Sequence, residues 1–349
     1  MSTIQTNAIV DASGGNTATV NGQNITSSNT MGRNLITNGG FYVWQRATTR
    51  AFGGGYTGAD RFAKGQYQEA GHERVSVTDV NVPSKFAAKV TSSSTSEASS
   101  GTRIAIGQMV ESVDSEIYAG KTVTLSFWIK FSAASLTGTT SGFSYQLSEY
   151  DTSADPAFGT TGATRTNQTF ISNGSYPTTW TKYTKTITCG ASMKNLGARF
   201  LFLELVNTSN NSDFSYEITG IQIELGSIAT DFEHRSYAEE LSSCQRYYTQ
   251  FDGRAAGAKF ASGFAASTTT AMIDLGIPVT MRATPTVTIT NCEIWDSAAS
   301  YTPSSPVATG GPYPASQGIQ LTSSGMTAYR PCSIRQSAAG VTITLSSEL

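Results

Sequence analysis

The stretch Leu125-Ser126-Phe127-Trp128-Ile129-Lys130 decides the fold class, because its large aliphatic and phenyl side chains recur at every second position. This period of two is the pattern of a β-strand with one buried face. Residues 198–206 form an almost continuous apolar run, and residues 216–225 alternate again. Ser, Thr, Gly and Asn fill the segments between such stretches, as in 132–142 and 207–213. Many short strands separated by polar turns predict an antiparallel β-sandwich rather than an α/β fold.

The composition supports a chain that is mainly β and has packed cores. Only 14% of the 349 residues are charged, and 33 are glycines. An average soluble domain has about 25% charged residues. Ser, Thr and Asn take their place here; Thr favours strands, whereas Gly, Asn and Ser favour turns. At about 150 residues per domain, the length predicts two domains with accessory segments.

The chain divides into four regions that differ in amino-acid composition and in hydrophobic pattern. Residues 1–33 are polar and rich in Gly, Asn and Thr, so they cannot bury enough apolar surface to fold alone. We expect them to be an N-terminal attachment arm that pairs with other copies or with a docking partner. Residues 34–228 are expected to form the first β unit, residues 229–250 a linker with a helix, and residues 251–349 a second, smaller β domain.

One helix is predicted, over residues 236–248. Ser236 and Glu239 have the S-x-x-E spacing of a capping box, in which each side chain bonds the backbone amide of the other residue. Four side chains then fall on one apolar stripe. They are Tyr237, Leu241, Cys244 and Tyr248. We expect this stripe to pack on a flanking domain or on its own copies in a trimer.

The second β unit has strand patterns over residues 271–279, 284–292 and 341–345. Between the last two, the segment 302–318 is rich in Pro, Gly and Ser. We expect it to be a long, exposed loop of the kind that carries function.

Charge, hydropathy and cysteine usage exclude several classes of protein. Lys and Arg number 23 against 25 Asp and Glu, and no basic patch stands out, so neither nucleic acid nor an anionic membrane is an expected partner. No apolar run approaches the ~20 residues of a membrane-spanning helix. The first residues lack the basic and apolar regions of a signal peptide, so we expect synthesis in the cytosol and release by host lysis. The cysteines lie far apart and are expected to be reduced and mostly buried. They are Cys189, Cys244, Cys292 and Cys332.

Several segments resemble a family of tailed-phage virion proteins. The first are residues 34–41 (NLITNGGF), continued by VWQR from Val43, and residues 56–62 (YTGADRF). The strongest match is residues 221–240 (IQIELGSIATDFEHRSYAEE), followed by CQRYY from Cys244. This run is similar to the end of the carbohydrate-binding-module-like jelly roll of such proteins, and to the short helix after it. Residues 278–287 (PVTMRATPTV) resemble the C-terminal β domain that often follows.

The resemblance implies a tail-fibre or receptor-binding subunit with a jelly roll over residues 34–228. It also implies a homotrimer that is joined to other virion proteins by the N-terminal arm and that binds a host-surface glycan. Modules of this type often hold a structural Ca²⁺, but residues 38–41 (NGGF) have no acid where one is often seen. The oxygen-rich segments 151–155 and 207–213 lack EF-hand spacing and are expected to be solvated turns. No metal or cofactor is therefore assigned, and a structural Ca²⁺ has no support from these residues.

The sequence lacks the usual signatures of an enzyme. Only two histidines occur, which excludes a His-rich metal site. No HExxH, GxSxG or Walker motif is present. Paired carboxylates for glycosidic cleavage would come from acids in or beside strands or in one loop, and nothing in the sequence places two of them together. These acids are Glu204, Glu217, Glu224, Asp151 and Asp155. We predict a protein without enzymatic activity.

Aromatic side chains are the candidate sugar contacts, because a flat ring can stack on the face of a sugar. Trp128 is the strongest candidate, since the alternation of its strand places it on a polar face beside Lys130. Alternatively, Trp128 fills a second hydrophobic layer or a trimer contact. Trp180 is also a candidate, although core packing is favoured for it. Trp295 and Tyr313 flank the loop-rich part of the last domain and are candidates for a distal contact surface.

Three hypotheses follow. The leading one is a homotrimeric tail-fibre subunit that attaches to host glycans through weak contacts multiplied by the number of copies. The second is a capsid decoration or tail adaptor protein that binds no sugar. The third is a polysaccharide-degrading tailspike, although the repeat of the parallel β-helix that such enzymes usually carry is missing. In each case the expected location is the virion, after assembly in the host cytoplasm.

Overall fold

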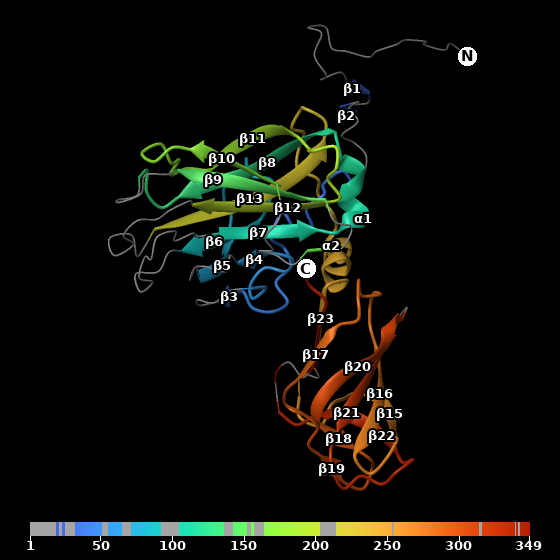
Figure 1. The fold of residues 1–349 in the computed structure, drawn as a ribbon. Helices are drawn as coiled ribbons and strands as arrows, with labels where there is room; N and C mark the ends of the chain where they lie inside the picture. Colours follow the sequence, from blue (N-terminus) through green and yellow to red (C-terminus); the bar gives the residue numbers. More distant parts are fainter. Residues whose placement is uncertain are drawn as a thin grey trace, which may run out of the picture.

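The computed structural model contains two β units with a short helix between them (Figure 1). The prediction of a mainly β, antiparallel chain is confirmed. The residues that the structure describes are 19–20, 23–24, 32–50, 55–64, 71–91, 105–135, 142–151, 155–156, 164–202, 214–252, 255–313, 316–338, 340 and 343–349.

Eight strands of the first unit form a jelly roll. In chain order they are β6 (Phe86–Thr91), β7 (Ala105–Val110), β8 (Thr122–Phe131), β9 (Phe143–Tyr150), β10 (Thr164–Ile171), β11 (Thr181–Thr188), β12 (Asn195–Phe202) and β13 (Ser215–Leu225). The first strand pairs with the last, the second with the seventh, the third with the sixth and the fourth with the fifth, always antiparallel. This nested pairing wraps one long hairpin into two facing sheets, which is the jelly-roll topology.

Shorter strands extend both sheets. In one sheet, β5 (Gly71–Ser76) pairs with β6, and β3 (Thr49–Arg50) pairs with β5. In the other, β4 (Ala63–Lys64) pairs with β7. A separate pair near the N-terminus joins β1 (Thr19–Val20) to β2 (Gln23–Asn24).

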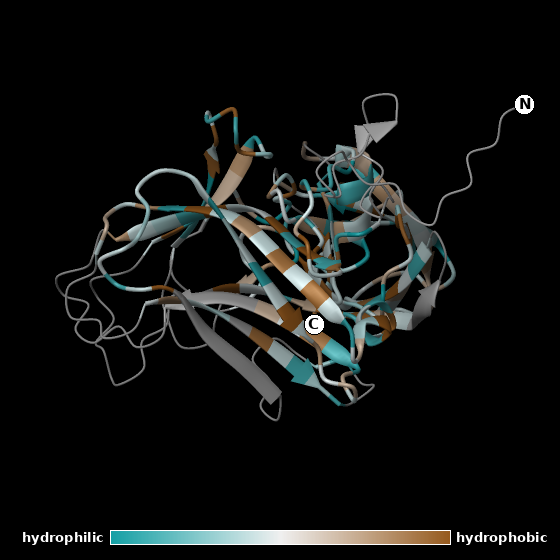
Figure 2. Ribbon diagram, turned by 90° about the horizontal axis from the view of Figure 1, so that it is seen from above, coloured by the Kyte–Doolittle hydropathy of each residue, from teal (hydrophilic) through white to brown (hydrophobic). Residues whose placement is uncertain are grey.

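The alternation along β8 builds the core of the sandwich. Leu125, Phe127 and Ile129 are at most 1% exposed and lie in one hydrophobic cluster with residues of the facing sheet. Trp128 and Lys130 lie on the opposite face of the strand and are half-buried. Figure 2 shows the same pattern as alternating hydrophobic and hydrophilic bands along strands. The period of two therefore predicted both faces of this strand correctly.

The helix between the units is α2 (Tyr237–Gln245), and its predicted capping box is confirmed. The backbone amide of Glu239 donates to Ser236 Oγ at 3.3 Å, and the amide of Ser236 donates to Glu239 Oε2 at 2.8 Å. The predicted apolar stripe is wrong in part: Cys244 is buried, but Tyr237 is 60% exposed and Tyr248 already belongs to strand β14. The helix stops earlier than predicted because the next strand begins there. A second short helical segment in the first unit consists of α1 (Ser112–Ser115) and the 3₁₀ turn η2 (Glu116–Tyr118).

The second unit contains a three-stranded and a seven-stranded antiparallel sheet over a core of its own. The smaller sheet has the order β14 (Tyr248–Phe251), β23 (Ile343–Ser346) and β17 (Thr286–Ile289). The larger has the order β19 (Ser300–Tyr301), β18 (Cys292–Trp295), β22 (Pro331–Gln336), β15 (Lys259–Ala265), β16 (Thr270–Gly276), β21 (Ser316–Thr322) and β20 (Ser304–Tyr313).

The predicted loop over residues 302–318 is wrong, because most of it is strand. β20 pairs with β21 across this segment, with irregular register between Ser304 and Val307 and again between Thr309 and Tyr313. Bulges of this kind accommodate Pro and Gly within a strand, which explains why the composition suggested a loop.

The remaining expectations concern cysteines and membrane spans. All four cysteines are free, and three of them are buried, as predicted. In the part of the chain that the structure describes, no helix has the length and apolar character needed to cross a membrane.

Candidate functional site

The structure brings Trp128, Lys130 and Trp180 together on the outer face of the jelly roll. Trp128 and Lys130 are two residues apart on β8, and Trp180 comes directly before β11, the neighbouring strand. The ammonium of Lys130 lies 5.3 Å from the centre of the Trp180 ring and 3.0 Å from the carboxylate of Glu217 on β13. On β11, Lys182 is opposite Trp128. We call these five residues the tryptophan patch.

A bulge in β13 shapes the surroundings of Trp128. The register between β13 and β8 shifts after Thr219, and Gly220 takes a left-handed conformation with φ 61°. A Cβ at Gly220 would lie 3.3 Å from Trp128 Cδ1 and 3.2 Å from Pro83 Cγ. Glycine at this position therefore lets the indole and the proline ring approach the backbone closely, which fixes the position of the half-buried Trp128.

The tryptophan patch combines two indole rings with charged and hydroxyl groups. Both rings are half-buried, and Thr184 and Thr186 continue the same face of β11 as exposed residues. An indole offers an apolar face for stacking, whereas ammonium and carboxylate groups form hydrogen bonds with hydroxyls. The ion pair between Lys130 and Glu217 orients these two side chains within the patch.

Trp295 lies in the second unit, away from the tryptophan patch. Lys259 Nζ is 3.5 Å from the centre of its ring, and the guanidinium carbon of Arg335 is 5.6 Å away. Arg335 is itself paired with Glu293 at 2.5 Å. One ring face of Trp295 thus already has a cation against it. Tyr313 ends β20 opposite Ser316, and its side chain is outside the described part of the structure.

The carboxylates considered for glycosidic cleavage have other partners. Glu217 pairs with Lys130, and Glu224 is 2% exposed and accepts hydrogen bonds from Gln222 and Thr230. Asp155 accepts from Asn195 and pairs with Arg282 at 3.1 Å. Asp151 is exposed, and Glu204 lies outside the described residues.

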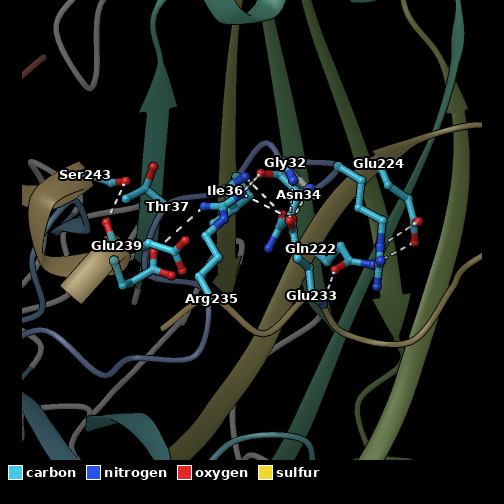
Figure 3. A network of polar contacts seen from close by, with 12 residues as sticks. Gly32, Asn34, Ile36, Thr37, Gln222, Glu224, Glu233, Arg235, Glu239 and Ser243 are labelled. Atoms are coloured by element: carbon cyan, nitrogen blue, oxygen red, sulfur yellow. Dashed lines mark hydrogen bonds and ion pairs between the residues drawn. The ribbon is translucent and has the colours of Figure 1, made fainter. Parts of the chain in front are cut away.

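Residues 32–37, strand β13 and the segment leading into α2 are linked by a network of polar contacts, which we call the polar joint (Figure 3). The backbone amide of Asn34 donates to Glu233 Oε2 at 2.7 Å, and the side chain of Asn34 bonds to the backbone of Ile221 and Ile223 on β13. Arg235 donates to the carbonyl oxygen of Asn34 and to Glu233. The residues of the motif therefore tie the beginning of the unit to its end.

Asn38 links the same polar joint to helix α2. It has a left-handed backbone with φ 60°, and its side chain accepts from the amide of Val43 at 3.0 Å while donating to the carbonyls of Val43 and Asp60. Its backbone amide donates to the carboxylate of Glu240 on α2. A Cβ at the next residue, Gly39, would lie 2.1 Å from the carbonyl oxygen of Ile221. The geometry thus accounts for Asn38 and for Gly39.

A buried ion pair connects the two β units. Arg61 is 1% exposed, donates to Glu348 at 2.6 Å and to the carbonyl of Met109 at 2.7 Å, and its guanidinium lies 3.4 Å from the centre of the Tyr247 ring. Arg46 binds the other oxygen of Glu348 at 2.9 Å. Burial by itself lowers the pKa of Arg61, but Glu348, Tyr247 and Tyr56 together outweigh it and the pKa is raised overall.

Two further contacts join the units. Arg246 forms a two-bond contact with Glu111 at 3.0 and 2.9 Å, and the hydroxyl of Tyr247 donates to the same carboxylate. Burial pushes the pKa of Glu111 up, but the hydrogen bonds from Arg246 and Tyr247 outweigh it, so the pKa is lowered. Asp155 and Arg282 form the other contact, and hydrogen bonds from Ser112 and Asn195 likewise lower the pKa of Asp155 against the effect of burial.

No metal site is found within the described residues, where no group of three or more His, Cys, Asp or Glu side chains could hold an ion. Most of the oxygen-rich segment 151–155 and all of 207–213 lie outside the described residues.

Sequence reasoning missed two parts of these sites. The place of Lys182 opposite Trp128 depends on the register between β11 and β8, which alternation alone does not give. The Arg61–Glu348 pair joins residues from opposite ends of the chain. Arg61 does occur in the YTGADRF segment of the resemblance, which was the available signal.

No family model and no curated protein matches this chain. Solved structures do show similarity at low identity. The enzymatically active domain of bacteriophage CBA120 tailspike protein 4 is 9% identical with a TM-score of 0.33, covering 56% of this chain and 22% of that one. A carbohydrate-binding module of family 61, solved with β-1,4-galactotriose, is 11% identical with a TM-score of 0.30, covering 56% of this chain and 99% of the module. The second family 22 xylan-binding domain of Xyn10C from Paenibacillus barcinonensis is 17% identical with a TM-score of 0.29, covering 54% and 97%.

Proposed function

We propose that this chain is a non-enzymatic tail-fibre subunit of a tailed-phage virion, and that its jelly roll attaches to a glycan on the host surface. The observation that carries the proposal is the tryptophan patch, where two half-buried indoles flank a fixed Lys130–Glu217 pair. Indole faces stack on the apolar face of a pyranose, and the charged groups bond its hydroxyls. Such contacts are individually weak, and a homotrimer attached to the virion by residues 1–33 would multiply them.

The test uses the full chain on an array of bacterial surface glycans. Binding is expected, and Trp180→Ala should weaken it by about tenfold, which corresponds to the loss of one stacking contact. Lys89→Ala is the matched control, because Lys89 also lies on this sheet and pairs with an acid, Glu73, at 3.8 Å. The control should change binding by less than about twofold, the change expected from an exposed pair. Absence of binding by the unmodified chain, or equal effects of the two variants, would overturn the proposal.

A second candidate function is a capsid decoration or tail adaptor protein without sugar binding. It is favoured by the cations at the candidate rings: Lys130 faces Trp180, and Lys259 lies against Trp295. Imaging of the virion with a labelled copy of the chain separates the candidates. Label at the distal tip of the tail supports attachment, whereas label over the capsid shell or inside the tail supports the structural role.

A further inference from the structure

The outer face of the seven-stranded sheet in the second unit carries a groove of about 520 Å³. It crosses β15, β16, β21 and β20, and no residue of the tryptophan patch takes part in it. Three strand spacings of about 4.8 Å make it ~14 Å long across the strands, enough for a short oligosaccharide. It is lined by Phe264, Met272, Asp274, Thr309, Ser316 and Gly318, among others.

The strand register arranges the side chains of this face in two parallel rows. Phe264 is opposite Met272, Met272 is opposite Gln320, and Gln320 is opposite Val307, which gives one largely apolar row. The neighbouring row has hydroxyls, one carboxylate and one glycine. It consists of Ser262, Asp274, Gly318 and Thr309. An apolar row thus runs beside a polar row along the groove.

Gly318 lets the side chain of Thr309 lie over the backbone of β21. A Cβ at this position would lie 2.6 Å from Thr309 Oγ1, so a larger residue would displace the threonine or fill the groove. The glycine between Asp274 and Thr309 therefore leaves no side chain of its own between these two polar groups, and a ligand can reach both.

The functional groups in the groove suit a neutral sugar. The Phe264 ring is 48% exposed and lies on the row beside the exposed Asp274 carboxylate. Asp274 has no ion pair and no side-chain hydrogen bond within the described part of the chain. A carboxylate accepts hydrogen bonds from two neighbouring hydroxyls, while the ring covers the apolar face of the same sugar. The described lining residues include no Lys, Arg or His, so an acidic sugar would meet the Asp274 charge without a compensating cation.

We propose that this groove is a second saccharide-binding site, selective for neutral sugars, with Phe264 as the stacking ring and Asp274 as the hydrogen-bond acceptor. The site shares no residue with the tryptophan patch. The proposal for the groove can therefore be correct or wrong independently of the proposed function. It gives each copy of the chain two separate points of contact with a surface polysaccharide.

The experiment is saturation-transfer NMR on the full chain with glucose, galactose, mannose and N-acetylglucosamine, and with glucuronate as the acidic counterpart. At least one neutral sugar should bind, and glucuronate should bind more weakly. Phe264→Ala and Asp274→Asn should each weaken neutral-sugar binding by about tenfold, which corresponds to the loss of one contact. Asp274→Asn should also raise glucuronate binding to the level of the neutral sugars, a gain that a loss of folding does not produce.

A control variant and a common background make the outcome decisive. Val307→Thr alters the far end of the apolar row, 54% exposed and outside the groove lining, and should leave binding within about twofold. All variants are measured in the Trp180→Ala background, which disables the tryptophan patch and leaves the groove as the site that is read out. The proposal is overturned if no neutral sugar binds, or if binding persists unchanged in both groove variants. It is also overturned if Phe264→Ala changes only the oligomeric state, since the groove is then a contact between copies.

Discussion

The guanidinium of Arg61 and the carboxylate of Glu348 meet at 2.6 Å between the two β units. Their side chains are 1% and 7% exposed, and Arg46 satisfies the second oxygen of Glu348. Arg61 belongs to the start of the jelly-roll unit, whereas Glu348 follows β23 at the end of the second. The pair therefore fixes the placement of one unit against the other.

Removing the charge of Glu348 should be strongly destabilising. Glu348→Gln leaves Arg61 buried without a counter-charge, which costs about 3–5 kcal/mol of unfolding free energy. Denaturant unfolding followed by tryptophan fluorescence measures it. Glu73→Gln is the control, because the Lys89–Glu73 pair is exposed and is worth less than about 1 kcal/mol. Equal losses in both variants would show that the buried pair has no special role.

The Glu111 contact should make the junction sensitive to acid. Because the folded-state pKa of Glu111 lies below its unfolded value, its contribution to stability is present above the unfolded pKa and is lost as pH falls through the folded one. The difference in melting temperature between the native chain and Glu111→Gln should thus be largest near pH ~7 and should approach zero toward pH ~3.

Asp114 on α1 provides the control for this prediction. Its pKa is raised by burial and by the nearby Glu111, so its contribution is present below the unfolded pKa and is lost as pH rises through the folded one. Asp114→Asn should therefore not lower the melting temperature at neutral pH. A Glu111→Gln gap that stays constant with pH would contradict the assignment.

Asn38 should be intolerant of alanine. Asn38→Ala leaves the amide of Val43 and two buried carbonyls without their side-chain partner, and alanine tolerates the left-handed backbone less well than asparagine. The lost hydrogen bonds and the poorer tolerance of alanine for this conformation should together cost roughly 2–5 kcal/mol of unfolding free energy. Asn38→Gly loses the same hydrogen bonds without the strain and should be about 1 kcal/mol more stable than Asn38→Ala. If the two variants are equally stable, the left-handed backbone stores no strain.

Gly39→Ala should disrupt the contact between the first segment and β13. The added methyl would lie 2.1 Å from the carbonyl oxygen of Ile221, a distance that forces the backbones apart. We expect a loss of at least about 2 kcal/mol, as for other overpacked sites. Gly276→Ala is the matched control, because no atom lies within 4 Å of its added methyl and its φ is not positive. Calorimetric melting of both variants tests the difference.

The fold was predictable where a local pattern carried it. The alternation of residues 125–130 predicted the buried and outward faces of β8, and the spacing of Ser236 and Glu239 predicted the start of α2. The end of α2 was not predictable, because Tyr248 joins a strand whose partner, β23, lies about a hundred residues further on. The composition of β20 suggested a loop because its bulges accommodate Pro and Gly within the strand.

The sites were predictable only in part. Period two placed Trp128 and Lys130 outward, but their contacts with Trp180 and Glu217 depend on the register of β8 with β11 and β13. Phe264 and Asp274 form a groove only because β15 and β16 pair in the observed register. Such relationships between strands are tertiary, and no spacing along one strand encodes them.

The polar joint has a mechanical consequence. Asn34 and Glu233, where the chain enters and leaves the jelly roll, are bonded to each other, and Arg61 is bonded to the end of the second unit. Tension applied between Gly32 and the second unit would run through these short contacts. The two sheets of the jelly roll would lie outside the path along which the force is transmitted. Tension along the chain therefore acts on the polar joint in shear. The β-sandwich stays folded until the contacts of the joint break.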